Sequence, residues 1–208
     1  MILRLELPKR FFVTGTDTGI GKSLVSAILM LGLDASYWKP IQSGLLDQSD
    51  TDWIKEVTER PSELFYPETY RLRNPLSPHE SARLDGVEIK LSDFQLPETK
   101  GTLIVEGAGG VLVPINQRQF MLDLIDYLEL PVIVVAKSGL GTINHTLLTL
   151  QSLKSKKIPI LGVVLSGDKN ARNAETIEFY GNIPVIAQIE RIKNFSPENL
   201  RRAYSRSF

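Results

Sequence analysis

Short apolar runs alternate with stretches of helical periodicity along most of the chain. The run Pro131 to Ala136 is rich in β-branched residues and has no polar interruption, as expected of a strand covered on both faces. Apolar residues recur at helical spacing over 24–29 and over 143–150. Further strand-like runs occupy residues 11–13, 102–105, 158–165 and 183–189. This alternation predicts an α/β fold, a parallel sheet with helices on both faces.

The segment between residues 44 and 101 has a weaker pattern. A helix is predicted over Asp50 to Arg60, whereas the prolines at 75 and 78 predict an irregular turn across Asn74 to Pro78. We interpret the segment as an elaboration of one domain that spans the whole chain. Because ligands of parallel sheets gather at the carboxyl ends of strands, the residues after each apolar run are the candidates for a site.

A glycine-rich segment, Gly15 to Ser23, lies between the first strand-like run and the first helical stretch. Glycines let successive backbone N–H groups point inward, and a helix start adds positive potential, which together suit a nucleotide phosphate. Lys22 would reach the β- and γ-phosphates, and Ser23 would ligate Mg²⁺. Five residues, rather than the usual four, separate Gly15 from Gly21. The alternative is a flexible turn with a surface lysine.

Two acidic positions are candidates for further Mg²⁺ ligands, which must be hard oxygen donors. Glu106 directly follows the strand-like run 102–105 and precedes a glycine-rich stretch that lets the backbone bend past a ligand. Asp50 is the second candidate, with Asp52 two positions on. The alternatives are an exposed acid at a turn for Glu106 and an ordinary helix start after Ser49 for Asp50.

Two more segments suit anions. Lys39 lies just after a further predicted strand, the second along the chain, and precedes Pro40, which stiffens the chain. It is therefore well placed to anchor a negative charge. Residues Gly139 to Asn144 join the run 131–136 to a helix, and the free amides of a helix start suit a carboxylate or a phosphate. A solvated lysine and a simple capped helix start are the respective alternatives.

Composition narrows the possible chemistry. The chain has no cysteine, which excludes disulfides, thiol nucleophiles and iron–sulfur clusters, and its two histidines, His79 and His145, exclude a His-rich metal site. Equal numbers of basic and acidic residues, 24 each, argue against nucleic-acid binding. Early charges at Arg4 and Glu6 and the lack of a long apolar run predict a cytoplasmic protein without a membrane contact.

Five motifs, in this order, resemble those of the dethiobiotin synthetase family. They lie at Val13–Ser23, Lys39–Gly44, Pro75–His79, Val105–Gly110 and Leu140–His145. The resemblance extends from about Arg10 to Ile189, and the longer phosphate loop is the form that this family uses. It implies a P-loop NTPase-like fold and ATP- and Mg²⁺-dependent closure of a ureido ring from 7,8-diaminononanoate and CO₂. The implied route passes through a carbamate and a carbamic–phosphoric anhydride.

The resemblance also implies roles for individual positions. Catalytic roles fall to Thr18, Lys22 and Lys39, and Mg²⁺ binding to Ser23, Asp50 and Glu106. The implied nucleotide-binding residues are Thr16, Asp17, Thr18, Gly19, Ile20, Gly21, Lys22, Ser23, Ser166 and Ile189. The implied substrate-binding residues are Lys39, Ser43, Gly107, Ala108, Gly109, Leu140, Gly141, Thr142, Ile143 and Asn144. In the homodimer that the family implies, residues 140–144 come from the neighbouring subunit and bind the substrate carboxylate.

Two positions depart from the family pattern. Ser166 stands where an asparagine that reads adenine is common, and Glu190 stands where proline is common. Asn170 or Asn173 could take over the reading of the base, so the base preference stays open.

A partitioning or positioning ATPase that dimerises on ATP is the rival from another class. Such proteins carry an additional lysine early in the phosphate loop, where this chain has Thr16 and Asp17. They also bind membrane or DNA through a basic surface. The C-terminal segment Asn199 to Arg206 is basic, but its short, weakly amphipathic pattern favours a solvated terminal helix.

Overall fold

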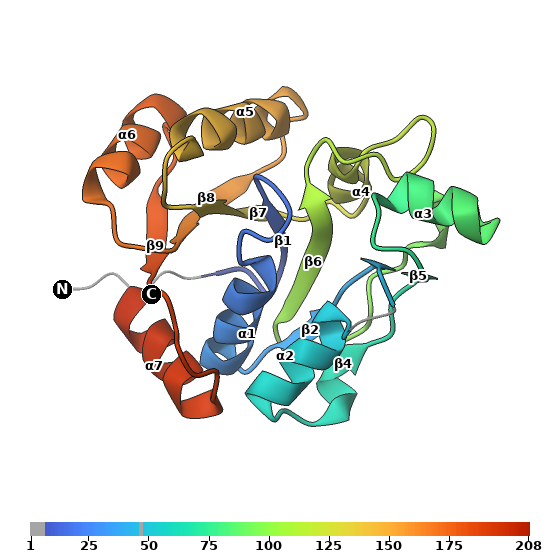
Figure 1. The fold of residues 1–208 in the computed structure, drawn as a ribbon, viewed down its shortest axis with the longest axis horizontal. Helices are drawn as coiled ribbons and strands as arrows, with labels where there is room; N and C mark the ends of the chain where they lie inside the picture. The colour runs from blue at the N-terminus through green and yellow to red at the C-terminus, as the bar shows by residue number, and fades with distance from the viewer. Residues whose placement is uncertain (1–6, 46–47) are drawn as a thin grey trace.

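A computed structural model describes residues 7–45 and 48–208, so Arg4 and Glu6 lie outside the described residues. Its centre is a seven-stranded sheet in which every strand pair is parallel, with the order β4-β2-β6-β1-β7-β8-β9 (Figure 1). The strands are β1 (Arg10–Gly15), β2 (Ser36–Trp38), β4 (Phe65–Tyr66), β6 (Leu103–Gly110), β7 (Val132–Lys137), β8 (Ile160–Ser166) and β9 (Val185–Ile189). The predicted α/β fold with a parallel sheet is confirmed.

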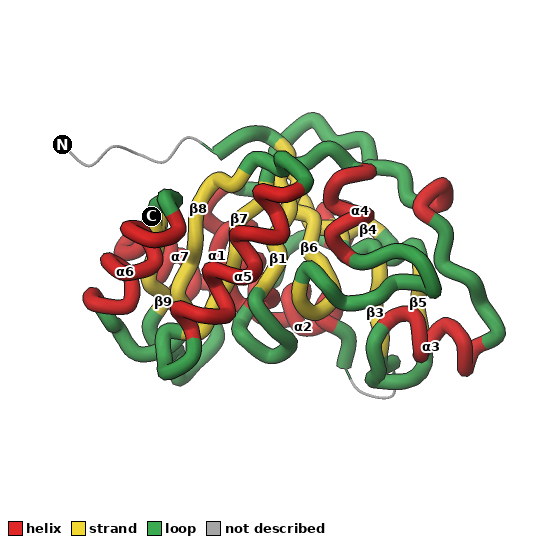
Figure 2. The backbone as a smooth tube through the Cα atoms, turned by 90° about the horizontal axis from the view of Figure 1, so that it is seen from above, coloured by secondary structure: helices red, strands yellow, loops and turns green. Residues whose placement is uncertain are grey.

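Helices cover both faces of this sheet (Figure 2). They are α1 (Lys22–Leu33), α2 (Asp50–Thr58), α3 (Pro78–Asp85), α4 (Met121–Tyr127), α5 (Thr142–Ser155), α6 (Ala171–Gly181) and α7 (Pro197–Ser207). Apolar side chains of α1, α2 and α7 pack in one core, and those of α4, α5 and α6 pack in the core on the opposite face. Two short 3-10 turns occupy Ser62–Leu64 and Leu91–Asp93.

The strand β1 illustrates why the apolar runs contain no polar residue. Phe11 and Val13 are fully buried in the core on the α1 side, and Phe12 between them is fully buried in the core on the other face. A strand with water on one face would alternate apolar and polar residues, whereas a strand between two helical layers buries both sets. Removing this apolar area from water is the main force that holds the helices on the sheet.

The segment between residues 44 and 101, together with the residues just before it, contains elements that the sequence pattern did not predict. A second, two-stranded parallel sheet pairs β3 (Ile41–Ser43) with β5 (Tyr70–Leu72). The turn predicted over residues 74–78 ends at Ser77, because Pro78 opens helix α3. Proline suits the first turn of a helix, where its missing N–H would have no partner in any case. The prediction that both prolines exclude a helix was therefore wrong for Pro78.

The C-terminal helix differs from the solvated helix that we predicted. Helix α7 packs on α1, with Leu200 fully buried and the guanidinium of Arg201 donating a hydrogen bond to the carbonyl of Leu31 at 3.0 Å. Only its outer face is exposed, which corrects the prediction. Within the part of the chain that the structure describes, no helix combines the length and the apolar character needed to cross a bilayer.

Candidate active site

Three neighbouring strands bring the predicted site together. Strand β6 lies between β2 and β1, so the carboxyl ends of all three meet at one edge of the sheet. A cavity of about 800 Å³ opens there, between the phosphate loop, α2 and the turn before α3. The predicted site residues that line it are Thr18, Gly19, Gly21, Lys22, Ser23, Lys39, Ser43, Asp50, Glu106, Ala108 and Gly109.

The phosphate loop ends in a helix start without a side-chain cap. Gly21 precedes α1 with φ +99°, in the left-handed region that favours glycine, and no side chain caps the helix. A Cβ at this position would lie 2.7 Å from the hydroxyl of Ser166, so a larger residue would require the side chain of Ser166 to move. The N–H of Val25 donates to the carbonyl of Gly21 at 2.9 Å, whereas among the described residues no group accepts a hydrogen bond from the N–H groups of Lys22, Ser23 and Leu24. These N–H groups are therefore available to an anion.

Lys22 lies over the loop that precedes it. Its ammonium group donates a hydrogen bond to the carbonyl of Asp17 at 2.9 Å, and its side chain is 7% exposed. Burial lowers the pKa of Lys22 to about 8, although the nearby charge of Glu106 partly offsets the effect. A negatively charged ligand beside Lys22 would restore the ordinary preference for the charged form.

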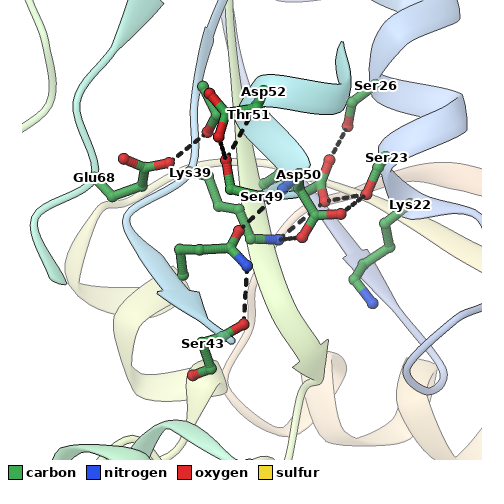
Figure 3. A network of polar contacts seen from close by, with 12 residues as sticks. Lys22, Ser23, Ser26, Lys39, Ser43, Ser49, Asp50, Thr51, Asp52 and Glu68 are labelled. Atoms are coloured by element: carbon green, nitrogen blue, oxygen red, sulfur yellow. Dashed lines mark hydrogen bonds and ion pairs between the residues drawn. The ribbon is translucent and has the colours of Figure 1, made fainter. Parts of the chain in front are cut away.

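A buried network of opposite charges forms the floor of the cavity (Figure 3). The ammonium nitrogen of Lys39 lies 2.8 Å from Asp50 Oδ2 and 3.2 Å from Glu106 Oε1. Ser23, on the first turn of α1, points its hydroxyl at the same two carboxylates, within hydrogen-bond reach of Asp50 and 3.0 Å from Glu106 Oε1. Lys39 directly follows β2, and helices supply Ser23 and Asp50. Glu106 lies within β6, which continues through the glycines to Gly110, and not after the end of the strand as the sequence predicted.

The charges in this network stabilise one another. Burial alone would lower the pKa of Lys39, but the charges of Glu106 and Asp50 outweigh it and raise that pKa above its usual value. Burial would raise the pKa of Asp50, but the ammonium group of Lys39 and the hydroxyl of Ser23 hold it below its usual value. Lys39 and Asp50 are therefore both charged at neutral pH.

The oxygen donors of the network fit Mg²⁺. A serine hydroxyl and two carboxylates are hard ligands of the kind that Mg²⁺ prefers, and the ammonium group of Lys39 shows that the two carboxylates stabilise a cation between them. No cluster of three or more acidic, histidine or cysteine side chains that could hold a metal occurs in residues 7–45 and 48–208. Phosphate oxygens would have to complete the coordination of a metal held by Ser23, Asp50 and Glu106.

Asp50 and Asp52 have different roles in the structure. The carboxylate of Asp52 accepts a hydrogen bond from the hydroxyl of Ser49 at 2.6 Å, while the backbone N–H of Asp52 donates to the same hydroxyl. These two hydrogen bonds between Ser49 and Asp52 cap α2. The sequence allowed such an ordinary helix start after Ser49 as the alternative to a metal ligand. Asp50, one residue into the helix, points into the cavity instead (Figure 3).

The residues proposed for the base lie beyond the phosphate loop, at the end of β8. Ser166 adjoins Gly21, and the buried Ile189 lies opposite it on β9. Each of the two asparagines that could replace the adenine-reading asparagine has one side-chain amide atom engaged in a hydrogen bond. The side chain of Asn170 caps α6 by accepting from the N–H of Asn173 at 3.0 Å, and the side chain of Asn173 donates to the carbonyl of Ser138 at 2.9 Å.

One predicted set does not join the cavity. Residues Leu140 to Asn144 form the start of α5 at the surface, where Leu140 is completely exposed. Gly141 has φ +89° and, as at Gly21, no side chain caps the helix. Besides Ser166 and Ile189, four other predicted residues lie outside the lining of the main cavity. Thr16 and Asp17 line a smaller pocket with His145, Ile20 is buried in the core on the α1 side, and Gly107 is buried in β6.

Several residues of the site gave no signal in the sequence. Trp53 and Val113 line the cavity through contacts that depend on the tertiary fold, and Gln42, which also lines it, lies in the motif Lys39–Gly44 but was not predicted as a site residue. Ser26 was missed because serine inside a helix is common, although its spacing of three from Ser23 places both on one helix face. Its hydroxyl donates to Glu106 Oε2 at 2.6 Å. The turn Pro75 to Pro78, noted in the sequence as a motif, forms one rim.

Comparisons with known proteins agree with this geometry. A model described as an AAA domain matches residues 9–199. The ATP-dependent dethiobiotin synthetase BioD of Brucella ovis is 43% identical over 199 residues, which cover 96% of this chain and 94% of that protein. The biotin biosynthesis bifunctional protein BioCD of Bordetella avium is 48% identical over 186 residues, or 89% of this chain, and the match covers 40% of that longer protein.

Solved structures with low sequence identity share the fold. A ParA family ATPase from Chlorobium tepidum superposes with a TM-score of 0.55 at 15% identity, over 96% of this chain and 90% of that one. Chloroplast FtsY from Physcomitrella patens gives a TM-score of 0.53 at 14% identity, over 97% of this chain and 67% of that one. These likenesses identify a P-loop NTPase-like fold and nothing more specific. The identity to the Brucella ovis protein over nearly the full length of both chains is specific, and the chain belongs to the dethiobiotin synthetase family.

Proposed function

We propose that this chain is an ATP-dependent dethiobiotin synthetase that acts on 7,8-diaminononanoate, CO₂ and ATP in the cytoplasm. The observation that carries the proposal is the cavity in which two lysines, two carboxylates and a free helix start meet. A reaction that joins a carbamate to a triphosphate must hold several negative charges together. Fixed cations and backbone N–H groups meet this requirement without reorganising during the reaction.

The proposed reaction needs no nucleophile from the protein. One substrate amine attacks CO₂ to give a carbamate, and a carbamate oxygen attacks the γ-phosphorus of ATP, which releases ADP and leaves a carbamic–phosphoric anhydride. The second amine attacks the carbonyl carbon of the anhydride, closes the five-membered ring and expels phosphate. Ring closure within one molecule depends mainly on positioning, so it makes small demands on acid–base groups.

Each group in the cavity has a proposed task. The first-turn N–H groups of α1 and the ammonium group of Lys22 bind the β- and γ-phosphates. Ser23, Asp50 and Glu106 hold Mg²⁺, which when bound neutralises phosphate charge and orients the γ-phosphate. When Mg²⁺ is bound, the ammonium group of Lys39 binds the negatively charged carbamate. Support for this task comes from its position, since it reaches both carboxylates from the strand next to β6.

Small side chains around these charges suit the reacting end of the substrate. The hydroxyl of Ser43 is buried and has no hydrogen-bond partner in the part of the chain that the structure describes, so it is available to a carbamate or an amine. Thr18 and Gly109 approach one another across the cavity mouth: a Cβ on Gly109 would lie 3.5 Å from the hydroxyl of Thr18. We assign Thr18, Ser43 and the backbone of Ala108 and Gly109 to substrate binding, and not Gly107, which lies outside the cavity lining.

The substrate carboxylate requires a second anion site. A long aliphatic chain separates it from the two amines, so one phosphate loop cannot hold both ends. We assign the carboxylate to the start of α5, residues 140–144, of a second copy in a homodimer. Two observations support the assignment. Leu140 is exposed in the single chain, and Gly141, with its left-handed backbone, leaves the helix start without a side-chain cap.

Incubation of the purified protein with the diamine, bicarbonate, Mg²⁺ and ATP tests the proposal directly. We expect dethiobiotin, detected by mass spectrometry, together with one ADP per ring. CTP and GTP belong in the same experiment, because Ser166 stands where the family commonly has an asparagine and because Asn170 Oδ1 and Asn173 Nδ2 are already hydrogen-bonded within the protein. A folded protein that yields no dethiobiotin with any of these nucleotides would refute the proposal.

The rival class predicts a different outcome in a parallel assay. A partitioning ATPase would co-sediment with DNA or with anionic lipid vesicles when ATP is added. The ParA family likeness concerns the fold alone, and the loop has Thr16 and Asp17 in place of the additional lysine. ATP-dependent co-sedimentation without ring closure would favour the rival.

A further inference from the structure

The two oxygens of the Glu106 carboxylate have different partners. Oε1 lies in the cavity floor, 3.0 Å from the hydroxyl of Ser23 and 3.2 Å from the ammonium nitrogen of Lys39. Oε2 accepts a hydrogen bond of 2.6 Å from the hydroxyl of Ser26. Glu106 and Ser26 are both fully buried. A buried carboxylate of this kind is tolerated only when hydrogen bonds and cations compensate for the loss of water.

Ser26 is placed to act on Glu106 and on nothing else in the site. It does not line the cavity, and Glu106 is the acceptor of its side-chain hydroxyl. Ser23 and Ser26 are three residues apart on α1, so the same helix face presents one hydroxyl to each carboxylate oxygen. Ser26 can therefore influence bound ligands only by fixing the orientation of Glu106.

The partners of Glu106 have different fates in the proposed reaction. Ser23 is assigned to the metal and Lys39 to the carbamate, so both partners of Oε1 are recruited when the site fills. Ser26 lies outside the cavity, and its bond to Oε2 can persist throughout. Once the site is loaded, this bond alone among the three keeps the carboxylate plane from rotating.

We propose that Ser26 is a positioning residue that holds Glu106 with Oε1 presented to Mg²⁺. The proposal rests on the proposed function, because it takes Glu106 as a metal ligand. Groups that orient a metal ligand from behind commonly change metal affinity by about 10–100-fold when they are removed. A serine that merely satisfied a buried charge would affect the stability of the fold and leave the response to Mg²⁺ unchanged.

The test compares ATP binding by calorimetry in the presence and absence of Mg²⁺, without the diamine, so that no turnover is needed. The variants are Ser26→Ala, which removes the donor, and Ser26→Cys, which keeps most of the volume with a weaker donor. Ser36→Ala is the matched control, since Ser36 is also a buried serine but its hydroxyl lies 3.5 Å from that of Thr99, away from the cavity.

We expect Ser26→Ala to bind ATP without Mg²⁺ as the parent protein does and to lose about tenfold or more of the Mg²⁺-dependent gain in affinity. Ser26→Cys should fall between the two, and Ser36→Ala should match the parent in both measurements. If Ser26→Ala does not fold, Ser26→Cys carries the test, with a loss of Mg²⁺ response as the expected result. A Mg²⁺ response equal to that of the parent in the folded serine variants would overturn the proposal.

Glu106→Gln separates this proposal from the proposed function. If Glu106→Gln removes the Mg²⁺ response and the serine variants retain it, Glu106 stands as a metal ligand and only the role of Ser26 is overturned. If Glu106→Gln itself responds to Mg²⁺ as the parent does, the metal assignment fails and the role of Ser26 fails with it. Dethiobiotin formation by the parent protein tests the proposed function independently of both results.

Discussion

Two helices of this protein begin in the same way and lie in contrasting surroundings. The residue before α1, Gly21, and the residue before α5, Gly141, have φ values of +99° and +89°, and neither helix start carries a side-chain cap. Helices α2, α6 and α7, by comparison, start with the side chains of Ser49, Asn170 and Ser196 accepting from backbone N–H groups. A helix start without a side-chain cap leaves N–H groups free for a ligand. At α5 the N–H of Thr142 donates to the carbonyl of Gly139 at 3.2 Å, so the free groups there are the N–H groups of Ile143 and Asn144.

The surroundings set the two helix starts apart. The start of α1 opens into a cavity with Lys22, Lys39 and two carboxylates, whereas the start of α5 lies on the surface with Leu140 fully exposed. Under the proposed function the first holds a polyphosphate and its metal, and the second holds the single carboxylate of the substrate. In this proposal the backbone of an uncapped helix start attracts an anion, and the charged side chains around it determine which anion binds.

Removing the ammonium group of Lys22, at the start of α1, should produce the largest effect on the rate of the reaction. In Lys22→Met the γ-phosphate loses its nearest fixed positive charge, and we expect the rate of dethiobiotin formation to fall by about 10²–10³-fold. The fold should persist, because the ammonium group of Lys22 makes one hydrogen bond and its burial lowers its own pKa. Steady-state kinetics and circular dichroism check both expectations.

Lys156→Met serves as the control for this substitution. Lys156 is an exposed lysine paired with Asp123 and lies at the C-terminal end of α5, away from the cavity. Its removal should leave the rate unchanged, since exposed ion pairs contribute little. A comparable loss of rate in both variants would show that Lys22 has no specific role in the reaction.

Lys39→Met should weaken the fold as well as the reaction. It leaves the buried carboxylate of Glu106 and that of Asp50 without their shared cation, and breaking such a pair costs about 3 kcal/mol. Urea unfolding with and without Mg²⁺ measures the effect. Mg²⁺ should restore part of the loss in Lys39→Met and should stabilise the parent less, because in the parent it competes with the ammonium group. Equal stabilisation of both proteins would contradict the proposed metal site.

Local sequence signals sufficed for the α1 site. The loop residues 15–23, Lys39 and Glu106 each follow an apolar run directly, and parallel strands bring such positions to one edge of a sheet. The signal at Asp50 was ambiguous, because Asp52 lies on the same helix and only the reciprocal cap with Ser49 separates the two.

Other features depend on contacts between distant segments. Ser26 faces Glu106 across a separation of 80 residues, and nothing near Ser26 in the sequence marks it. The strands β3 and β5 are three residues long, too short for a clear periodicity. The sequence could also predict an uncapped helix start at α5. It could not predict that this start lies outside the cavity of its own chain, because that position depends on the tertiary fold.

A negative charge at the start of α5 should affect substrate binding selectively. In Gly141→Asp the new carboxylate accepts from the first-turn N–H groups and repels an incoming anion. We expect the KM for the diamino acid to rise about tenfold or more, with the affinity for ATP unchanged. Gly141→Ala, which adds a similar backbone strain without the charge, should have the smaller effect on KM. An unchanged KM in Gly141→Asp would remove the carboxylate from this helix start.

Mixing two impaired homodimers, assayed at a diamine concentration well below the KM of the parent protein, tests whether the two helix starts serve one site across a subunit boundary. In a dimer that combines Lys22→Met with Gly141→Asp, one site contains both changes and the other contains neither. After exchange of subunits in equal amounts, we expect about a quarter of the parent activity, because half of the dimers are mixed and each has one intact site. Activity that stays at the level of the separate variants would place both helix starts of a site in one chain.

The smallest expected effect is a pH dependence that belongs to the α1 site. The pKa of Lys22 is lowered to about 8 by burial, so its neutral form grows as the pH rises through 8. ATP favours the charged form, and its affinity should fall about twofold between pH 7 and pH 8, with uptake of a proton on binding. Calorimetry in buffers of different ionisation enthalpy measures both quantities. Lys22→Met should bind more weakly and lose this decline, whereas Gly141→Asp should keep it, because the α5 site acts through backbone N–H groups that do not titrate.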